Sequence, residues 1–135
     1  MITWQSKDLS FEAPFMFLFI GNNKAILFDT GATNDMIRFP LRKTVDAILE
    51  KWLSKNKREN YELIVAHTHE HNDHTSGDTQ FLHRANTKVI AKDLDSVGSF
   101  FGIQKGALGT GKCDLGGRVL IILPIPRHDP GSISI

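Results

Sequence analysis

The sequence predicts a mixed α+β domain in which short buried strands are combined with amphipathic helices. Three observations favour this class. Apolar residues recur with a helical period over 41–53, continuous apolar runs fill 15–20 and 25–28, and the apolar run 63–66 ends directly before a cluster of histidines. A helical period places apolar side chains on one face of a helix, whereas short continuous apolar runs are typical of strands buried in a sheet.

Length and charge restrict the class of protein. A chain of 135 residues has the size of one domain, and with 41% hydrophobic residues it can bury a modest core. The 16 Lys and Arg nearly balance the 15 Asp and Glu. This composition provides no basic field for nucleic acid, which weighs against a nucleic-acid substrate.

The cellular compartment is inferred from two features. Cys113 is the single cysteine, so an intramolecular disulfide is excluded, and a free thiol fits a reducing cytoplasm. The apolar run 14–20 is too short to span a bilayer, and no small-residue cleavage site follows it. We therefore expect a soluble, cytoplasmic protein that does not interact with a membrane.

The first half of the chain predicts a short strand at 2–4, then a β-hairpin with strands at 15–20 and 25–28, both buried on two faces. The second hairpin strand ends in Asp29-Thr30-Gly31, where glycine permits a sharp turn. A helix is predicted over 41–53, with Pro40 suited to its first turn. Its apolar stripe consists of Leu41, Val45, Ile48, Leu49, Trp52 and Leu53.

The second half predicts a buried strand at 63–66 that carries the histidine loop at its carboxyl end, where ligand sites in layered sheets are favoured. A helix is expected from near Thr75 toward His83, with Asp73 or Thr75 as its cap. Further predicted elements are a strand at 88–91, a helix at 93–101, a hairpin turn at 115–118 and a strand at 119–123.

The histidine loop is the most informative stretch, because four of the six histidines lie within residues 67–74. In an extended chain, side chains two residues apart point the same way, so His69 and His71 converge and Asp73 follows in that register. A helix that begins near Thr75 would turn His74 to another side, so one loop offers ligands to two ions. Imidazole and carboxylate suit zinc best, then iron or manganese. The alternative is a polar loop of solvated histidines.

Residues 68–77 read Thr-His-Glu-His-Asn-Asp-His-Thr-Ser-Gly and resemble the T-H-x-H-x-D-H signature of the metallo-β-lactamase superfamily. Its members include hydroxyacylglutathione hydrolases, lactonases, RNA-processing nucleases and lactamases. The resemblance implies an αββα four-layer sandwich that performs metal-dependent hydrolysis. Asp29-Thr30-Gly31 resembles the D-T-G that closes an early strand near the metal loop of this family, which would let Asp29 orient a ligand histidine. The alternative is a turn aspartate that satisfies local backbone amides.

The stretch 124–132 resembles the P-G-H-x-x-G-S loop of the same superfamily, whose histidine is the third ligand of the first metal. Pro126, Gly131 and Ser132 match this loop, whereas Arg127 stands where the family usually has glycine. The histidine of the loop is His128. The resemblance therefore implies that His128 completes the first metal site.

The resemblance also implies a role for each ligand. His69, His71 and His128 would hold the first zinc ion and leave a fourth position for water, the open arrangement of a catalytic zinc. Asp73 and His74 would hold a second ion. Asp73 is also the candidate catalytic residue, because its carboxylate would orient the nucleophile or pass a proton to the leaving group.

Other polar residues near the motif have plainer interpretations. His67 precedes the matched signature, and we expect it to be packed or to support a ligand. His83 is expected at the surface, and Cys113 is expected to be structural. Glu70 lies between two ligands, where it either tunes the site or is solvated.

The resemblance covers about 15–135, roughly the first βα half of the sandwich, because the family's bridging aspartate and last histidine would lie beyond Ile135. We therefore expect residues 1–135 to be a single domain truncated at its C-terminus, with an oligomer or a complementing C-terminal half as partner. The expected function is hydrolysis of a small-molecule ester, thioester or lactone. The alternatives are a non-catalytic fragment that binds metal weakly and a nucleic-acid phosphodiester hydrolase of the same fold.

Overall fold

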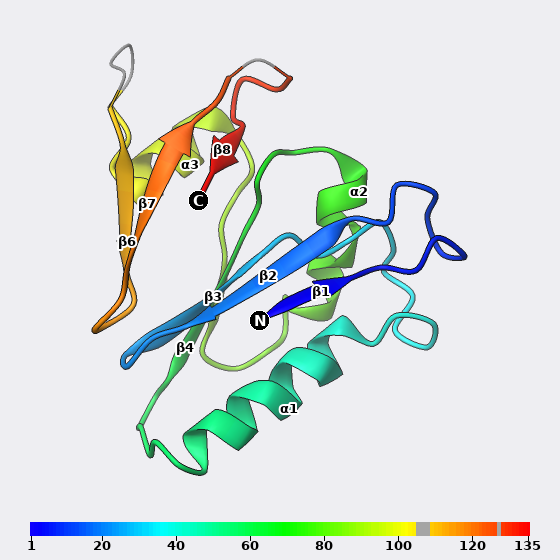
Figure 1. Cartoon of the computed structure of the whole chain (residues 1–135), viewed down its shortest axis with the longest axis vertical. Coiled ribbons are helices and arrows are strands. Elements are labelled where there is room, and N and C mark those ends of the chain that lie inside the picture. The colour runs from blue at the N-terminus through cyan, green and yellow to red at the C-terminus, as the bar shows by residue number, and fades with distance from the viewer. Residues whose placement is uncertain (105–108, 127) are drawn as a thin grey trace.

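The computed structural model describes residues 1–104, 109–126 and 128–135. Within these residues the chain forms a five-stranded sheet, a three-stranded sheet and the helices that pack against them (Figure 1). The mixed α+β class predicted from the sequence is therefore confirmed.

The five-stranded sheet has the order β1-β2-β3-β4-β5. Its first three strands are antiparallel, whereas β3, β4 and β5 are parallel, so the carboxyl ends of β3 and β4 lie at the same edge. The strands are β1 (Ile2–Trp4), β2 (Phe15–Ile20), β3 (Lys24–Phe28), β4 (Glu62–Ala66) and β5 (Thr87–Val89). The strand predicted at 88–91 thus begins and ends earlier than expected.

Burial in the predicted hairpin differs between its two strands. β3 is buried on both faces, as predicted, because it lies in the middle of the sheet between two hydrophobic clusters. The same prediction is wrong for β2, in which Met16 and Leu18 are buried but Phe15 is 54% exposed. The second face of β2 is only partly covered, with Phe17 and Phe19 packed at the margin of a cluster.

Helix α1 (Leu41–Leu53) covers one face of the five-stranded sheet and matches the predicted range. Leu41, Val45 and Leu49 are its buried residues and face the apolar side chains of β3 and β4. The helix lacks a capping side chain of its own, but Gln80 Oε1 accepts a hydrogen bond from Arg42 N at 3.1 Å. This bond ties the start of α1 to the segment that follows the histidine loop.

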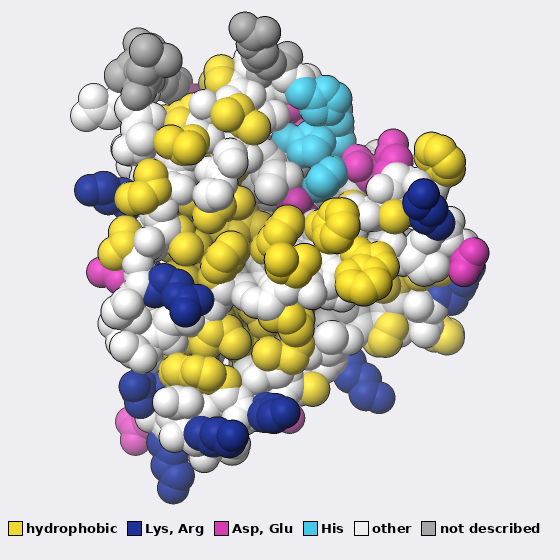
Figure 2. All heavy atoms as spheres, in the orientation of Figure 1, with side chains coloured by type: hydrophobic (Ala, Val, Ile, Leu, Met, Phe, Trp, Pro, Cys, Tyr) yellow, Lys and Arg dark blue, Asp and Glu magenta, His cyan; other side chains and the backbone are white. Residues whose placement is uncertain are grey.

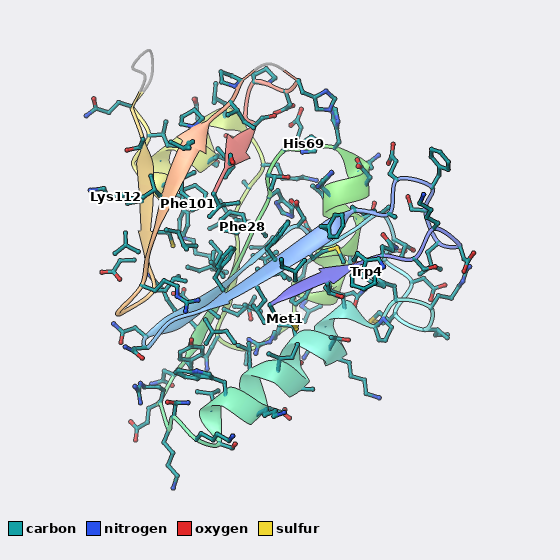
Figure 3. All side chains as sticks on the ribbon, viewed as in Figure 1. Met1, Trp4, Phe28, His69, Phe101 and Lys112 are labelled. Atoms are coloured by element: carbon teal, nitrogen blue, oxygen red, sulfur yellow. The ribbon has the colours of Figure 1, made fainter. Side chains whose placement is uncertain are left out.

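The opposite face of the sheet packs against helix α3 (Leu94–Phe101) and the three-stranded sheet of β6 (Gly111–Asp114), β7 (Val119–Pro124) and β8 (Ile133–Ser134). Phe28 of β3 stacks on Phe101 of α3, with ring centroids 6.1 Å apart (Figure 3). Asp93, predicted as part of the helix, is instead its N-cap and accepts a bond from Ser96 N at 2.9 Å. The hairpin turn at 115–118 is confirmed between β6 and β7.

The helix predicted from Thr75 toward His83 is wrong in its start and in its type. The chain forms one α-helical turn, α2 (Asn72–Thr75), followed by a 3-10 helix, η1 (Ser76–Gln80). Neither Asp73 nor Thr75 provides a side-chain cap. Tertiary contacts hold this segment against the chain that follows β3. Thr30 N donates to His74 O, Ser76 N donates to Gly31 O, and a Cβ on Gly77 would lie 2.3 Å from Thr30 O.

Hydrophobic side chains also reach the surface, as Figure 2 shows over β2 and β7. On β7, Val119, Ile121 and Leu123 are each at least 44% exposed. Among the described residues, no helix combines the length and apolar character needed to cross a membrane.

Candidate metal centre

The histidine loop leaves the carboxyl end of β4 and leads into α2, as the position of His69 in Figure 3 shows. Two other segments reach the same place. The end of β3 is joined to it through Thr30 N, which donates to His74 O at 2.7 Å. The start of β8 is joined through Ile133 N, which donates to Thr68 O at 2.8 Å. The loop between β7 and β8 is therefore held alongside the histidine loop, and His128 is carried to it.

His69, His71 and His128 form one group of converging side chains, here called the imidazole cluster. Each offers one nitrogen, and these atoms lie within 4.8 Å of one another. His71 Nδ1 and His128 Nε2 are 3.0 Å apart although 57 residues separate them in the chain. His69 is half-buried, whereas His71 and His128 are exposed, and Figure 2 shows histidine side chains gathered at the surface.

His69, Asp73 and His74 form a second group, here called the mixed donor group, whose ligand atoms also lie within 4.8 Å of one another. Asp73 Oδ2 lies 3.1 Å from His74 Nε2, and the rings of His69 and His74 have centroids 4.1 Å apart. The five residues singled out in the sequence as metal ligands are thus brought together. His69 belongs to both groups, so the two groups are adjacent.

The side chain of Asp29 contacts two residues of the histidine loop, Thr68 and His74. Its carboxylate is buried, with Oδ1 accepting a bond from Thr68 N at 2.8 Å and Oδ2 lying 2.9 Å from His74 Nδ1. Thr68 Oγ1 donates to Oδ2 at 2.9 Å. These partners lie about 40 residues away along the chain, so the carboxylate contacts the histidine loop and does not merely satisfy a local turn.

Asp29 also has a strained backbone. Its φ is +66°, in the left-handed region where a non-glycine residue costs of order 1 kcal/mol. Such strain persists where the surrounding structure over-determines it. The carboxylate contacts with Thr68 and His74, together with the bond from Asp29 N to Ala66 O at 2.9 Å, surround this conformation.

The two half-buried histidines have opposite pKa shifts. Burial lowers the pKa of His69, and the positive charges of His74 and His71 lower it further. For His74, burial opposes protonation, but the hydrogen bond to Asp29 and the negative charges of Asp29 and Asp73 outweigh it and raise the pKa. The lowered pKa of His69 favours its neutral form, the form in which an imidazole binds a metal.

The remaining candidates lie outside both groups. His67 is buried and its Nε2 lies 2.8 Å from Asp78 Oδ1, which agrees with the prediction of a packed histidine. His83 and Glu70 are exposed, and Cys113 is buried in a hydrophobic cluster, as expected for a structural cysteine. Arg127, noted as a departure from the family loop, lies outside the described residues.

A hollow of about 610 Å³ opens beside the imidazole cluster. Its wall is mainly apolar. Sequence reasoning missed this hollow, because its apolar residues resemble ordinary strand and loop residues. The lining residues are Thr68, His69, Ile125, Pro126, His128, Ser132 and Ile133.

Comparison with known proteins agrees with this geometry. Residues 10–135 match the family model described as the metallo-beta-lactamase superfamily. The match includes both donor groups, Asp29 and the loop that carries His128. No curated protein matches the chain at a significant level.

Proposed function

This chain belongs to the metallo-β-lactamase superfamily, and from that premise we propose that it is a zinc-dependent hydrolase of a small-molecule ester, thioester or lactone. Members of this superfamily are commonly hydrolases. The observation that carries the proposal is the convergence of His69, His71 and His128, whose donor atoms lie within 4.8 Å of one another.

The donor set fits zinc. Three imidazoles with a fourth position free for water are the ligand set of an open catalytic zinc site, and the carboxylate of Asp73 extends the set toward a second ion. When bound, zinc lowers the pKa of its water to about 7 and polarises the oxygen of the scissile carbonyl. The lowered pKa of His69 supports this assignment, because it favours the neutral imidazole and a protonated imidazole cannot bind a metal.

Asp29 prepares His74 for the same task. An ionised carboxylate only accepts hydrogen bonds, so its contact with His74 Nδ1 places the ring proton on that nitrogen. In the neutral form of His74 the lone pair is then on Nε2, which lies 3.1 Å from Asp73 Oδ2. Because the two carboxylates raise the pKa of His74, binding of a metal at Nε2 would displace a proton. Holding the tautomer and orientation of a ligand histidine in this way is the usual role of a carboxylate behind a metal site.

Asp73 is the residue to which we assign proton transfer. Its side chain is half-buried in the mixed donor group, which shares His69 with the imidazole cluster. A carboxylate there accepts a proton from the attacking water and returns it to the oxygen or sulfur of the leaving group. This gives an acid and an alcohol or thiol as products.

The substrate class rests on the hollow beside the cluster. Ile125, Pro126 and Ile133 give it an apolar wall that begins at His69 and His128. An apolar acyl or alcohol group of a small substrate fits such a wall with its carbonyl toward the histidines. The near balance of charge in the chain also weighs against a polyanionic substrate.

The test combines metal analysis with a substrate panel. Zinc per chain is measured by mass spectrometry on the purified protein, and turnover is measured with short-chain p-nitrophenyl esters, acyl thioesters and lactones. The variants His69→Ala, His71→Ala and His128→Ala are expected to lose most of the zinc and the turnover. His83→Ala is the matched control, because His83 is an exposed histidine outside both donor groups.

We expect one or two zinc ions per parental chain and no loss in the control. A parental protein that binds no metal would contradict the proposal, as would equal zinc loss in all four variants.

A further inference from the structure

A second set of polar contacts lies behind the metal ligands and has no part in the proposed reaction. His67, directly after β4, is 4% exposed and its Nε2 lies 2.8 Å from Asp78 Oδ1 on η1. Thr30, at the end of β3, donates from Oγ1 to the same carboxylate oxygen at 2.8 Å. One carboxylate oxygen therefore joins the ends of two parallel strands to the segment that follows the histidine loop.

The direction of these bonds follows from their chemistry. A carboxylate only accepts, so His67 donates from Nε2, and Thr30 directs its single hydroxyl hydrogen mainly to Asp78 Oδ1 at 2.8 Å, with His74 O as a more distant acceptor at 3.3 Å. Hydrogen bonds to a carboxylate are among the stronger ones in proteins, and burial of His67 makes its partner costly to remove. The three residues thus form one network, and the hydroxyl of Thr30 also brings it within reach of the His74 carbonyl.

The network reaches the metal ligands through the backbone. Thr30 N donates to His74 O at 2.7 Å, and Ser76 N donates to Gly31 O at 3.0 Å. These bonds anchor the carbonyl of His74 and the amide of Ser76 to the segment that directly follows β3, so the chain on the C-terminal side of this ligand is fixed. The close approach of Gly77 to Thr30 O completes the contact.

We infer that His67 and Asp78 are positioning residues that act through Thr30 to fix the backbone at His74, and hence the mixed donor group of His69, Asp73 and His74. This inference rests on the proposed metal site. It differs from the role of Asp29, which holds the side chain of His74 from Nδ1. The imidazole cluster is less dependent on the network, because His128 lies on the loop between β7 and β8, and the start of the histidine loop is tied to β8 through Ile133 N and Thr68 O.

The test uses Co²⁺ as the probe, added to the metal-free protein and followed by its visible absorption. We expect the first equivalent of Co²⁺ to fill the imidazole cluster and the second to fill the mixed donor group. His67→Leu and Asp78→Asn should bind the first Co²⁺ with nearly parental affinity and the second about tenfold or more weakly. A loss of this size is typical when a residue that orients a metal ligand is removed. His67→Gln is the rescue variant, because its amide nitrogen can donate to Asp78 in place of Nε2. It should restore the second equivalent and its absorption band.

Val45→Ala is the control for a merely structural effect. Val45 is fully buried on α1, so this change lowers the melting temperature without touching the network. It should bind both equivalents of Co²⁺ with parental affinity, even if its melting temperature falls as much as that of His67→Leu or Asp78→Asn.

The inference is overturned if His67→Leu and Asp78→Asn bind both equivalents like the parent, or weaken both equally. It is also overturned if Val45→Ala loses the second equivalent to the same extent. Failure of the parental protein to bind any Co²⁺ is a distinct result, which contradicts the proposed function together with this inference.

Discussion

Asp29 and His74 are 45 residues apart in the chain and are joined by a contact of 2.9 Å between Oδ2 and Nδ1. The contact connects the end of β3 to a candidate metal ligand. Because Asp29 also accepts bonds from Thr68, its carboxylate organises the start and the end of the histidine loop together.

Asp29→Asn is expected to weaken zinc binding about 10- to 100-fold, the effect typical of removing a carboxylate behind a ligand histidine. Asparagine tolerates the left-handed backbone of this position, so the fold should persist. Zinc affinity is measured by competition with a chromophoric chelator. Glu59→Gln, an exposed change of the same charge, is the control. Parental zinc affinity in Asp29→Asn would show that the contact is not needed for binding.

Removal of metal is expected to lower the melting temperature by several degrees. A ligand present at 100 times its dissociation constant stabilises the folded state by about 2.7 kcal/mol. The measurement is thermal denaturation before and after dialysis against a chelator, with restoration on adding zinc. His71→Ala should show little response to the chelator, because it lacks one imidazole of the cluster. If the melting temperature of the parental protein does not change after treatment with the chelator, this prediction is contradicted.

Gly77→Ala is expected to destabilise the fold by about 1–3 kcal/mol and to reduce metal binding. The added Cβ would lie 2.3 Å from Thr30 O, a backbone atom that cannot move without shifting the histidine loop. Gly102→Ala is the comparison, because its φ is +70° but nothing lies within 4 Å of the new Cβ. It should cost only the conformational strain and leave metal content unchanged. Denaturant unfolding and zinc analysis check both variants.

Cys113 is expected to resist thiol reagents in the folded protein. Burial raises the pKa of its thiol, and the residue is only 5% exposed. Since the thiolate is the reactive form, a higher pKa leaves less of it at pH 8. Reaction with a disulfide reagent is measured in buffer and in guanidinium chloride. We expect slow reaction in buffer and one rapid equivalent after unfolding, whereas rapid reaction of the folded protein would contradict the burial of this side chain.

Local patterns predicted the elements whose cause is local. The helix over 41–53 forms as expected because its apolar stripe has a clear helical period, and the strands at 15–20 and 63–66 were evident from continuous apolar runs. The helix expected from Thr75 toward His83 failed for the opposite reason. Its segment is held by contacts with Thr30 and Gly31, more than 40 positions away in the chain, which no local pattern records.

The same division applies to the candidate site. The sequence by itself determined which side chains can bind a metal, since His69, His71, Asp73 and His74 lie within six residues and the loop with His128 resembles that of a known family. The tertiary structure decided that His128 lies 3.0 Å from His71. It also decided that His67 pairs with Asp78, since pairing across a fold is set by how its strands and loops pack. The ability of a side chain to bind a metal depends on its residue type, which the sequence specifies. Whether several such side chains meet, and which residues hold them in place, depends on distances that exist only after folding.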